Sequence, residues 1–361
     1  MATILLGPDN AQRYNTDIHE EHNHEDHRRL STRKIFESCD FDKNGLDLFY
    51  TGPYSNIVKL TGIPSIPRIT MCAPSPPKIV AIKQIRPPKH EVFTLFLRAN
   101  PVGKNVTHVQ DPEAFIRNEL MIWSILDTHT NIVPLLGLTT MDDLDHIWGS
   151  CNGPLAVCRY YQERSLQELR GVIRGLEHIH QKMVIHGDLK AANVTVESLG
   201  DTTIAKIIDF GSSKLQCWCF TGQNDQCGTM LWDSPELFED EPRTPSSDVW
   251  AFGCLALEVQ MGLYPYAGDS REDMDIRRLV MLQARGDLPA NESDLDLENK
   301  PISRSVWEVI QRCWEFEPCD RPNSPALVEL LERIQIGMIR DYTVDTSEAQ
   351  SMLTSNTVAA C

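Results

Sequence analysis

The chain has 361 residues, a formal net charge of −17 at pH 7 and 41% hydrophobic residues. This length can hold one large two-lobed domain or two ordinary ones, and the apolar fraction is normal for a protein with a folded core. The acidic balance argues against a nucleic-acid-binding surface, which needs basic patches, and no apolar run reaches the roughly 18 residues of a membrane span.

Two features bear on the compartment. The first ten residues lack a basic start followed by a long apolar core, so no signal peptide is predicted. The 11 cysteines show no regular spacing. Together these features predict reduced thiols in an intracellular, cytoplasmic protein, with neither nucleic acid nor membrane among its partners.

Both ends of the chain are polar. Residues 1–45 contain a group of histidines among acidic residues: His19, His22, His24 and His27. A metal site or a solvated tail would produce this pattern, and the composition favours a disordered tail. A calcium loop beginning at Asp40 would need a bidentate Glu at the position of Thr51, so we expect no calcium site. Residues 336–361 also predict a disordered tail.

The elements expected first along the chain are strands. Apolar runs predict strands at Leu48–Tyr50, Ile57–Leu60 and Lys78–Arg86. A Pro-rich stretch over 63–77 and a second insertion over 87–112 are predicted to be loops.

Helices are expected to follow. Apolar residues recur at helical spacing after Glu113 and predict a helix with one buried face. The second half of the chain is expected to be mainly helical, with stretches of helical pattern at Leu166–His180, Ser247–Met261, Ser303–Cys313 and Leu327–Ile334.

One short segment contains most of the candidate chemistry. Residues His186–Asn193 read His-Gly-Asp-Leu-Lys-Ala-Ala-Asn, and Asp209-Phe210-Gly211 begins 16 residues after Asn193. This spacing supplies a base, a cation, an amide ligand and a metal-binding carboxylate. Phosphoryl transfer from ATP needs these groups, because its catalysis is mostly positioning and charge neutralisation around Mg²⁺.

Further motifs extend the pattern in one order. Val80-Ala-Ile-Lys83, Ser234-Pro-Glu236 and Arg321-Pro322 accompany the two segments above. Together they resemble the eukaryotic protein-kinase superfamily, and the His-Gly-Asp-Leu-Lys form is similar to fungal members of its tyrosine-kinase-like group. The resemblance covers about 46–335.

The resemblance implies an α+β fold with two lobes. A small β-rich N-lobe with one main helix is expected over about 46–160 and a larger helical C-lobe over about 161–335. In the family, an aspartate at the position of Asp248 braces the backbone of the catalytic loop. The arginine matching Arg321 pairs with a glutamate of the activation segment, here Glu236.

The resemblance also assigns roles to the motif residues. Asp188 would accept or orient the proton of the substrate hydroxyl, and Lys190 would lie near the γ-phosphate. Asn193 and Asp209 would hold Mg²⁺ through oxygen atoms.

A second set of residues would bind the nucleotide. Lys83, on a strand with Ala81, would neutralise the α- and β-phosphates of ATP. Glu119 on the following helix is the expected partner of Lys83, and Glu113 is the weaker candidate because it lies at the start of the helix.

The phosphate-binding glycine loop is degenerate. Its best register runs through Gly52, Ser55 and Ile57, and only Gly52 is glycine. Pro53 lacks an amide hydrogen, and Ser55 stands where a glycine would let the backbone approach phosphate. We therefore expect weaker binding of ATP.

Two other departures affect regulation and structure. Gly187 replaces the arginine through which an activation-segment phosphate usually acts, so constitutive activity or another control is expected. The segment 162–175 is shorter than in the family, and one helix is missing or fused there. A decayed kinase and an error in the gene sequence would both explain this gap.

The sequence therefore predicts a kinase that transfers the γ-phosphoryl group of ATP, with Mg²⁺, to a Ser or Thr hydroxyl of a protein substrate, and less readily to Tyr. A pseudokinase that acts as a binding or scaffold module remains the alternative, because of the degenerate loop and the short segment. Aminoglycoside- and choline-kinase-like enzymes share the His-Gly-Asp motif, but Glu236, Asp248 and Arg321 follow the protein-kinase pattern. The oligomeric state stays open.

Overall fold

The computed structural model describes residues 46–51, 55–61, 79–85, 112–126, 129–139, 155–159, 169–199, 202–216, 228–239, 241–266, 276–292 and 302–334. The expected tails, most of the two expected loops and the start of the short segment 162–175 lie outside these residues. The described part forms two compact units. The first contains the described residues up to 159 together with Lys182–Val184 and 209–216, and the second contains the others.

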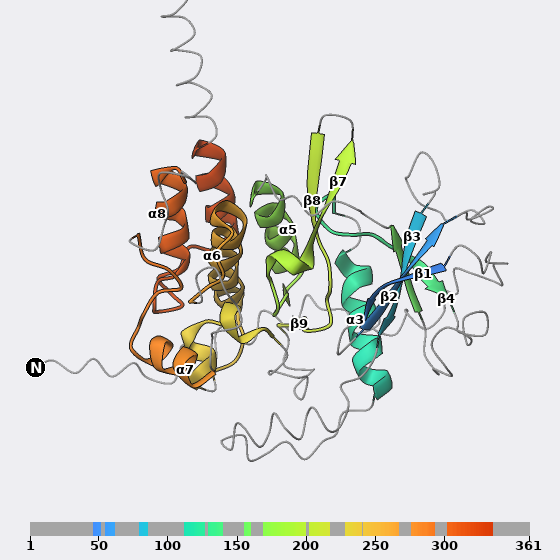
Figure 1. Cartoon of the computed structure of the whole chain (residues 1–361), viewed down its shortest axis with the longest axis horizontal. Coiled ribbons are helices and arrows are strands. Elements are labelled where there is room, and N and C mark those ends of the chain that lie inside the picture. The colour runs from blue at the N-terminus through green and yellow to red at the C-terminus, as the bar shows by residue number, and fades with distance from the viewer. Residues whose placement is uncertain are drawn as a thin grey trace, which may run out of the picture. The chain divides into compact units, whose positions relative to one another are not determined.

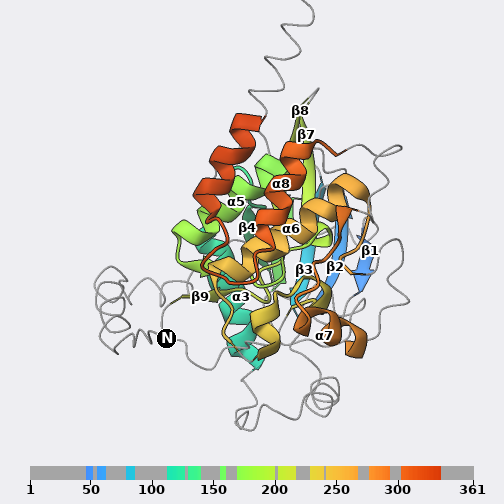
Figure 2. The same cartoon turned by 90° about the vertical axis from the view of Figure 1, so that its left-hand side faces the viewer.

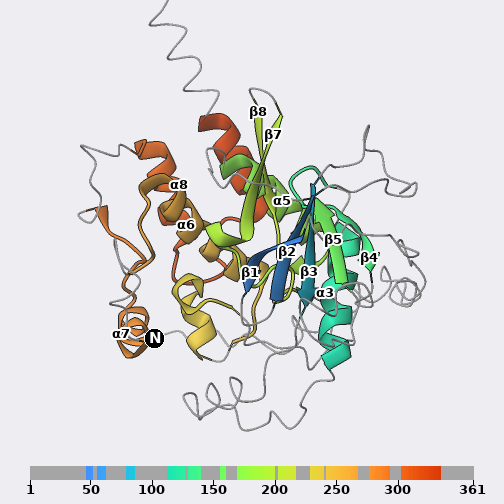
Figure 3. The ribbon, with the colours of Figure 1, turned by 45° about the vertical axis from the view of Figure 1, so that its right-hand side comes forward.

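An antiparallel sheet of five strands, in the order β1-β2-β3-β5-β4, forms the base of the first unit (Figure 3). The strands are β1 (Leu46–Thr51), β2 (Ser55–Thr61), β3 (Ile79–Ile85), β4 (Leu135–Thr139) and β5 (Leu155–Arg159). The three strands expected first are confirmed as β1, β2 and β3. The strand β5 was not predicted, because its short apolar run has no alternating pattern that would separate it from a loop.

The helix α3 (Pro112–Leu126) belongs to the same unit as the sheet and is drawn beside it in Figures 1 and 3. This helix was expected from the apolar spacing after Glu113. The side chains of Leu120, Ile122, Trp123 and Leu126 are buried, which confirms the buried face. The indole Nε1 of Trp123 donates to the carbonyl of Val133 at 2.6 Å.

The second unit is mostly helical. Its helices are α5 (Leu169–Gln181), α6 (Pro245–Met261), α7 (Ile276–Ala284), α8 (Arg304–Cys313) and a last helix over 324–334. All except α7 were expected, and Figure 2 shows α6 and α8, which pack against each other. None of the helices within the described residues combines the length and the apolar character needed to cross a membrane.

The second unit also contains a β-hairpin that was not predicted. It consists of β7 (Val194–Leu199) and β8 (Thr202–Ile207), and it is visible in Figure 1. The short elements η4 (Ala191–Asn193), η6 (Met230–Trp232) and η7 (Pro235–Glu239) also belong to the second unit. The strand β9 (Lys214–Leu215) belongs to the first unit, and β6 (Val184–Ile185) has one residue in each. The hairpin matters for the site because β7 begins directly after Asn193.

The helix α6 forms the core of the second unit. It is apolar on nearly all sides, which is typical of a helix buried all round. Pro245 at its first turn and Gly262 at its end, with a left-handed φ of 69°, define its limits. Trp250 and Phe252 on this helix are each 1% exposed.

Asp248 on α6 has a buried carboxylate that holds the loop His186–Asn193, called the catalytic loop. Its Oδ2 accepts from the backbone N–H of His186 at 2.8 Å, and its Oδ1 accepts from that of Gly187 at 2.9 Å. His180 Nε2 lies 3.0 Å from Oδ2. The brace implied by the family resemblance is therefore present.

The pair of Glu236 and Arg321 is also present. Arg321 Nη1 and Nη2 donate to the two carboxylate oxygens of Glu236 at 2.9 and 2.8 Å. The guanidinium also lies 5.0 Å from the centre of the Trp250 ring. This two-point contact fixes η7 against the core of the second unit.

Replacement of Asp248 by Asn should destabilise the chain most at neutral pH. Burial alone would raise the pKa of Asp248, but hydrogen bonds from His180 and the loop outweigh it and lower the pKa below the ordinary 3.8. The stability that the ionised carboxylate contributes is therefore present above about pH 4 and is lost as the pH falls through the lowered pKa. We expect Asp248→Asn to cost about 3 kcal/mol in the free energy of unfolding near neutral pH.

Chemical denaturation between about pH 7 and about pH 3.5 would measure this. The difference between wild type and Asp248→Asn should shrink towards the acid end, while the exposed control Asp287→Asn should stay within about 0.5 kcal/mol of wild type. A difference that stays constant or grows on acidification would contradict the assignment.

Candidate active site

One group of candidate residues, called the Lys83 cluster, consists of Lys83, Glu119 and Asp209, all in the first unit. Lys83 Nζ donates to Glu119 Oε1 at 2.6 Å and to Asp209 Oδ1 at 2.7 Å. Lys83 and Glu119 are 7% and 2% exposed. The structure thus pairs Lys83 with the expected Glu119 and adds Asp209 as a second partner.

The charges of this cluster are strongly coupled. Burial alone would lower the pKa of Lys83, but the carboxylates of Asp209 and Glu119 outweigh it and raise that pKa. Burial, together with the charge of Asp209, raises the pKa of Glu119 although Lys83 opposes this. The ammonium therefore stays charged near neutral pH, where it can meet a phosphate.

Asp209 has a left-handed backbone conformation. Its φ of 67° is uncommon for a residue other than glycine. The next residue, Phe210, is fully buried and packs at 6.1 Å from Trp123. The side chain of Asp209 remains 39% exposed. The buried phenylalanine thus anchors the segment and leaves the carboxylate accessible.

The other residues predicted to bind nucleotide belong to the sheet. Ile57 on β2 is in register with Lys83 on β3. Ala81 lies two residues before Lys83 on the same strand, so Ile57, Ala81 and Lys83 share one face of the sheet. The backbone of Ser55 is in register with Ile85. The remaining predicted residue, Gly52, lies outside the described residues.

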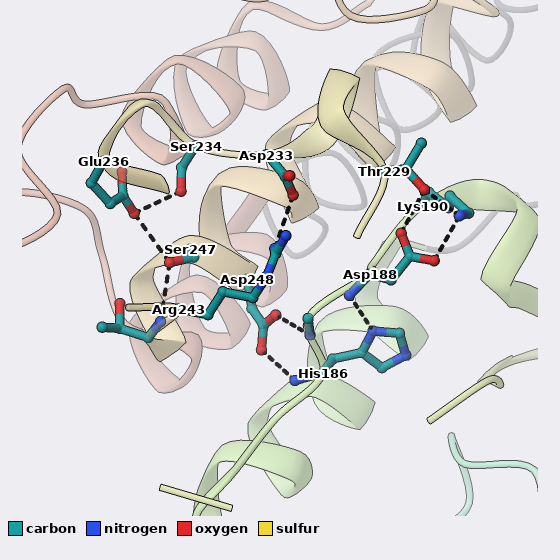
Figure 4. Close-up of polar contacts among 12 residues, drawn as sticks. His186, Asp188, Lys190, Thr229, Asp233, Ser234, Glu236, Arg243, Ser247 and Asp248 are labelled. Carbon is teal, nitrogen blue, oxygen red and sulfur yellow. Dashed lines mark hydrogen bonds and ion pairs between the residues drawn. The ribbon is translucent and has the colours of Figure 1, made fainter. Parts of the chain in front are cut away.

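A separate group, called the Asp188 cluster, consists of Asp188, Lys190, Asn193 and Thr229 in the second unit. Lys190 Nζ donates to Asp188 Oδ2 at 2.6 Å and also to the Thr229 hydroxyl. Thr229 Oγ1 donates to Asp188 Oδ1 at 2.7 Å (Figure 4). Asn193 Nδ2 donates to Oδ2 and to the carbonyl of Asp188, at 2.9 and 2.7 Å. Three side chains therefore orient one carboxylate.

The loop that contains Asp188 is held by hydrogen bonds to Asp248 on α6. Gly187 has a φ of 79°, a left-handed conformation that glycine adopts without steric cost. Its N–H and that of His186 both donate to Asp248, and Figure 4 shows the contact with His186. Ile208 N donates to the carbonyl of Asn193 at 3.0 Å, and Asp209 follows in the chain.

Two residues of this region were not predicted to belong to the site. Thr229 lies 41 residues from Asp188 in the sequence, so no local spacing connects them. Glu258 on α6 accepts from Ala191 N at 3.1 Å and from Trp232 Nε1 at 3.3 Å. It thereby connects the catalytic loop to η6. The sequence signal for Thr229 was only its place beside Gly228, and for Glu258 there was none.

Similar proteins are kinases. The serine/threonine-protein kinase mos of Patiria pectinifera is 27% identical over 232 residues, covering 58% of this chain and 61% of that protein. The RGS domain-containing serine/threonine-protein kinase A of Dictyostelium discoideum is 28% identical over 255 residues, covering 68% of this chain and 21% of that protein. A Raf homolog serine/threonine-protein kinase of Caenorhabditis elegans is 30% identical over 174 residues, covering 46% and 20%.

The chain thus spans less than two thirds of the length of each of these relatives. The relatives are in keeping with the expected tyrosine-kinase-like group. The family model described as "Protein kinase domain" matches residues 99–331, which is more than half of the chain. The expected two-lobed α+β kinase fold is confirmed by this match together with the sheet and the helices of the two units. The chain belongs to the protein kinase domain family.

Proposed function

We propose that the chain is an ATP-dependent protein kinase that transfers the γ-phosphoryl group to a Ser or Thr hydroxyl of a protein. The observation that carries the proposal is the Asp188 cluster, in which Lys190, Asn193 and Thr229 all bind one carboxylate. A carboxylate held in this way can accept a hydrogen bond from a substrate hydroxyl and orient it for attack.

The Lys83 cluster supports the nucleotide half of the proposal. A buried ammonium held by Glu119 and Asp209 has its position fixed before ligand arrives. Two oxygens of a nucleotide diphosphate group could replace Asp209 as partners of Lys83, since phosphate oxygens attract the ammonium in the same way. Ile57 and Ala81 on the same face of the sheet would then contact the base.

The residues also fit the proposed Mg²⁺. Asp209 offers a partly exposed carboxylate, and Asn193 uses its amide nitrogen to bind Asp188, which turns its oxygen away from that carboxylate. Both atoms are hard oxygen ligands, and Mg²⁺ commonly combines one or two protein oxygens with phosphate oxygens and water. Bound there, Mg²⁺ would neutralise charge on the phosphates.

The remaining residues of the Asp188 cluster would manage charge and proton. Asp188 would hold the acceptor hydroxyl, and its carboxylate would receive the proton as the hydroxyl oxygen bonds to the γ-phosphorus. The bond from that phosphorus to the bridging oxygen would break, and ADP would leave. The ammonium of Lys190 lies beside the Asp188 carboxylate, which would hold the acceptor hydroxyl. From there Lys190 would stabilise negative charge on the transferred group. Thr229 would keep the second carboxylate oxygen in place.

The substrate class and setting follow from the same reasoning. The relatives are named serine/threonine-protein kinases, which favours a protein with Ser or Thr as the acceptor. We place the kinase domain over 46–335, as expected from the sequence, and its activity inside the cell, where ATP is supplied. A pseudokinase would retain the fold without turnover, and a phosphoryl-transfer assay separates the two.

Asp188→Asn should abolish phosphoryl transfer. The variant keeps the shape of the side chain but removes the charged acceptor, which should cost roughly 100-fold or more in kcat. The measurement is transfer of radiolabelled phosphate from Mg-ATP to generic protein substrates by the purified full chain. The exposed Asp320→Asn serves as the matched control and should behave as wild type.

Wild-type turnover that disappears in Asp188→Asn and persists in Asp320→Asn supports the kinase. If the wild-type chain shows no turnover, or if its turnover persists in Asp188→Asn, the proposal is contradicted and the pseudokinase is favoured.

Thr229→Val should lower kcat while leaving the KM for ATP unchanged. Valine matches threonine in shape but cannot donate to Asp188, and a hydrogen bond to a charged group contributes about 1.5–3 kcal/mol. We therefore expect a loss of roughly tenfold to 100-fold in kcat. Thr229→Ser keeps the hydroxyl and should retain most activity in the same steady-state assay. Equal losses in the Val and Ser variants would show that the hydroxyl is not what matters.

A further inference from the structure

Another buried ion pair, between Arg243 and Asp233, lies near the Asp188 cluster. The kinase motifs of the sequence assign no role to these two residues. Arg243, between η7 and α6, is 8% exposed, and its Nη1 lies 2.9 Å from Asp233 Oδ1 (Figure 4). Burial alone would lower the pKa of Arg243, but Asp233 outweighs it and raises that pKa. The guanidinium therefore stays charged, and its contact with Asp233 is buried.

The backbone of Gly228 lies directly against this pair. A Cβ atom added at Gly228 would lie 2.2 Å from Arg243 Nη2 and 2.9 Å from Asp233 Oδ1. Contacts this short do not occur, and the guanidinium cannot swing away without leaving both its burial and its partner. Only glycine fits at position 228 while Arg243 stays in place.

The residues between Gly228 and Asp233 form one short turn, η6, with the Thr229 hydroxyl at its start. Trp232 N donates to the carbonyl of Thr229 at 2.8 Å, and Asp233 N donates to that of Met230 at 3.2 Å. The guanidinium of Arg243 thus contacts the turn at both ends, through the backbone of Gly228 and the carboxylate of Asp233. Any shift of the ion pair moves Thr229, and with it the donor to Asp188.

We infer that Arg243 and Asp233 are positioning residues that hold the Thr229 hydroxyl, and through it Asp188, in the arrangement that accepts a protein hydroxyl. This inference rests on the proposed function and adds a means of control. The pair holds the turn from within the folded chain, so no added phosphate is needed there, and Gly187 leaves the loop without an arginine to bind one.

The test combines steady-state kinetics and amide hydrogen exchange on the full-length chain. The variants are Arg243→Met, Arg243→Lys, Asp233→Asn, Gly228→Ala and the charge exchange Asp233→Arg with Arg243→Asp. Kinetics give kcat and the KM values for a protein acceptor and for ATP. Exchange is followed at the amides of Trp232 and Asp233, whose hydrogen bonds form the turn.

Loss of the pair should act on the acceptor side of the reaction. Arg243→Met and Asp233→Asn should lower kcat/KM for the acceptor by about 100-fold, because misplacement by about 1 Å has this effect, with the KM for ATP unchanged. Exchange at both amides should become faster. Gly228→Ala should have the same effect by displacing the guanidinium.

Restoration distinguishes positioning from a general loss of folding. Arg243→Lys keeps the charge and should retain most of kcat/KM, and the charge exchange should recover part of it. The control is Arg174→Met, which removes an exposed ion pair with Glu332 of 2.7 Å in the same unit and should change neither readout.

Unchanged kinetics and exchange in Arg243→Met and Asp233→Asn would overturn the inference. So would equal losses in every kinetic parameter with no recovery in the Lys and charge-exchange variants. If the wild-type chain has no turnover, the proposed function fails separately, and exchange alone decides. Faster exchange that the charge exchange reverses supports the pair, and unaltered exchange refutes it.

Discussion

The buried carboxylate of Asp248 is the contact on which the catalytic half of this protein depends. It belongs to the helix at the core of the second unit, and it binds the two backbone N–H groups at the start of the catalytic loop. Because a charge buried at 2% exposure needs hydrogen-bond donors, the helix and the loop cannot separate without a large loss. The loop that contains Asp188 is therefore held in place by α6, the helix at the core of the unit.

Glycine at position 187 and arginine at position 243 differ in the charge that they bring to the region around Asp188. Gly187 carries no cation, and its left-handed φ would cost an arginine roughly 1–2 kcal/mol. Arg243 instead supplies a buried cation that is neutralised within the chain by Asp233. Position 187 therefore has no cation that could bind a phosphate. The ion pair of Arg243 and Asp233 contacts the turn that carries Thr229.

Sequence reasoning succeeded where the signal was local. Apolar spacing located α3, α6 and α8, because a buried helical face repeats every three to four residues. Motif spacing singled out Lys83, Asp188 and Asp209, of which Lys83 and Asp209 are in contact. It missed β5 and the β7–β8 hairpin, whose short runs lack a clear period, and it missed Thr229, because 41 residues separate it from Asp188. Contacts made by long-range folding leave no local pattern, and the same is true of Glu258 and the Asp233–Arg243 pair.

The central claim is that the Lys83 cluster binds the phosphates of a nucleotide. The most direct measurement is a crystal structure of the full chain with Mg²⁺ and a non-hydrolysable ATP analogue. The claim predicts the α- and β-phosphates against Lys83, with Mg²⁺ between the phosphates and the carboxylate of Asp209. A nucleotide bound elsewhere, with its phosphates away from Lys83, would contradict the claim.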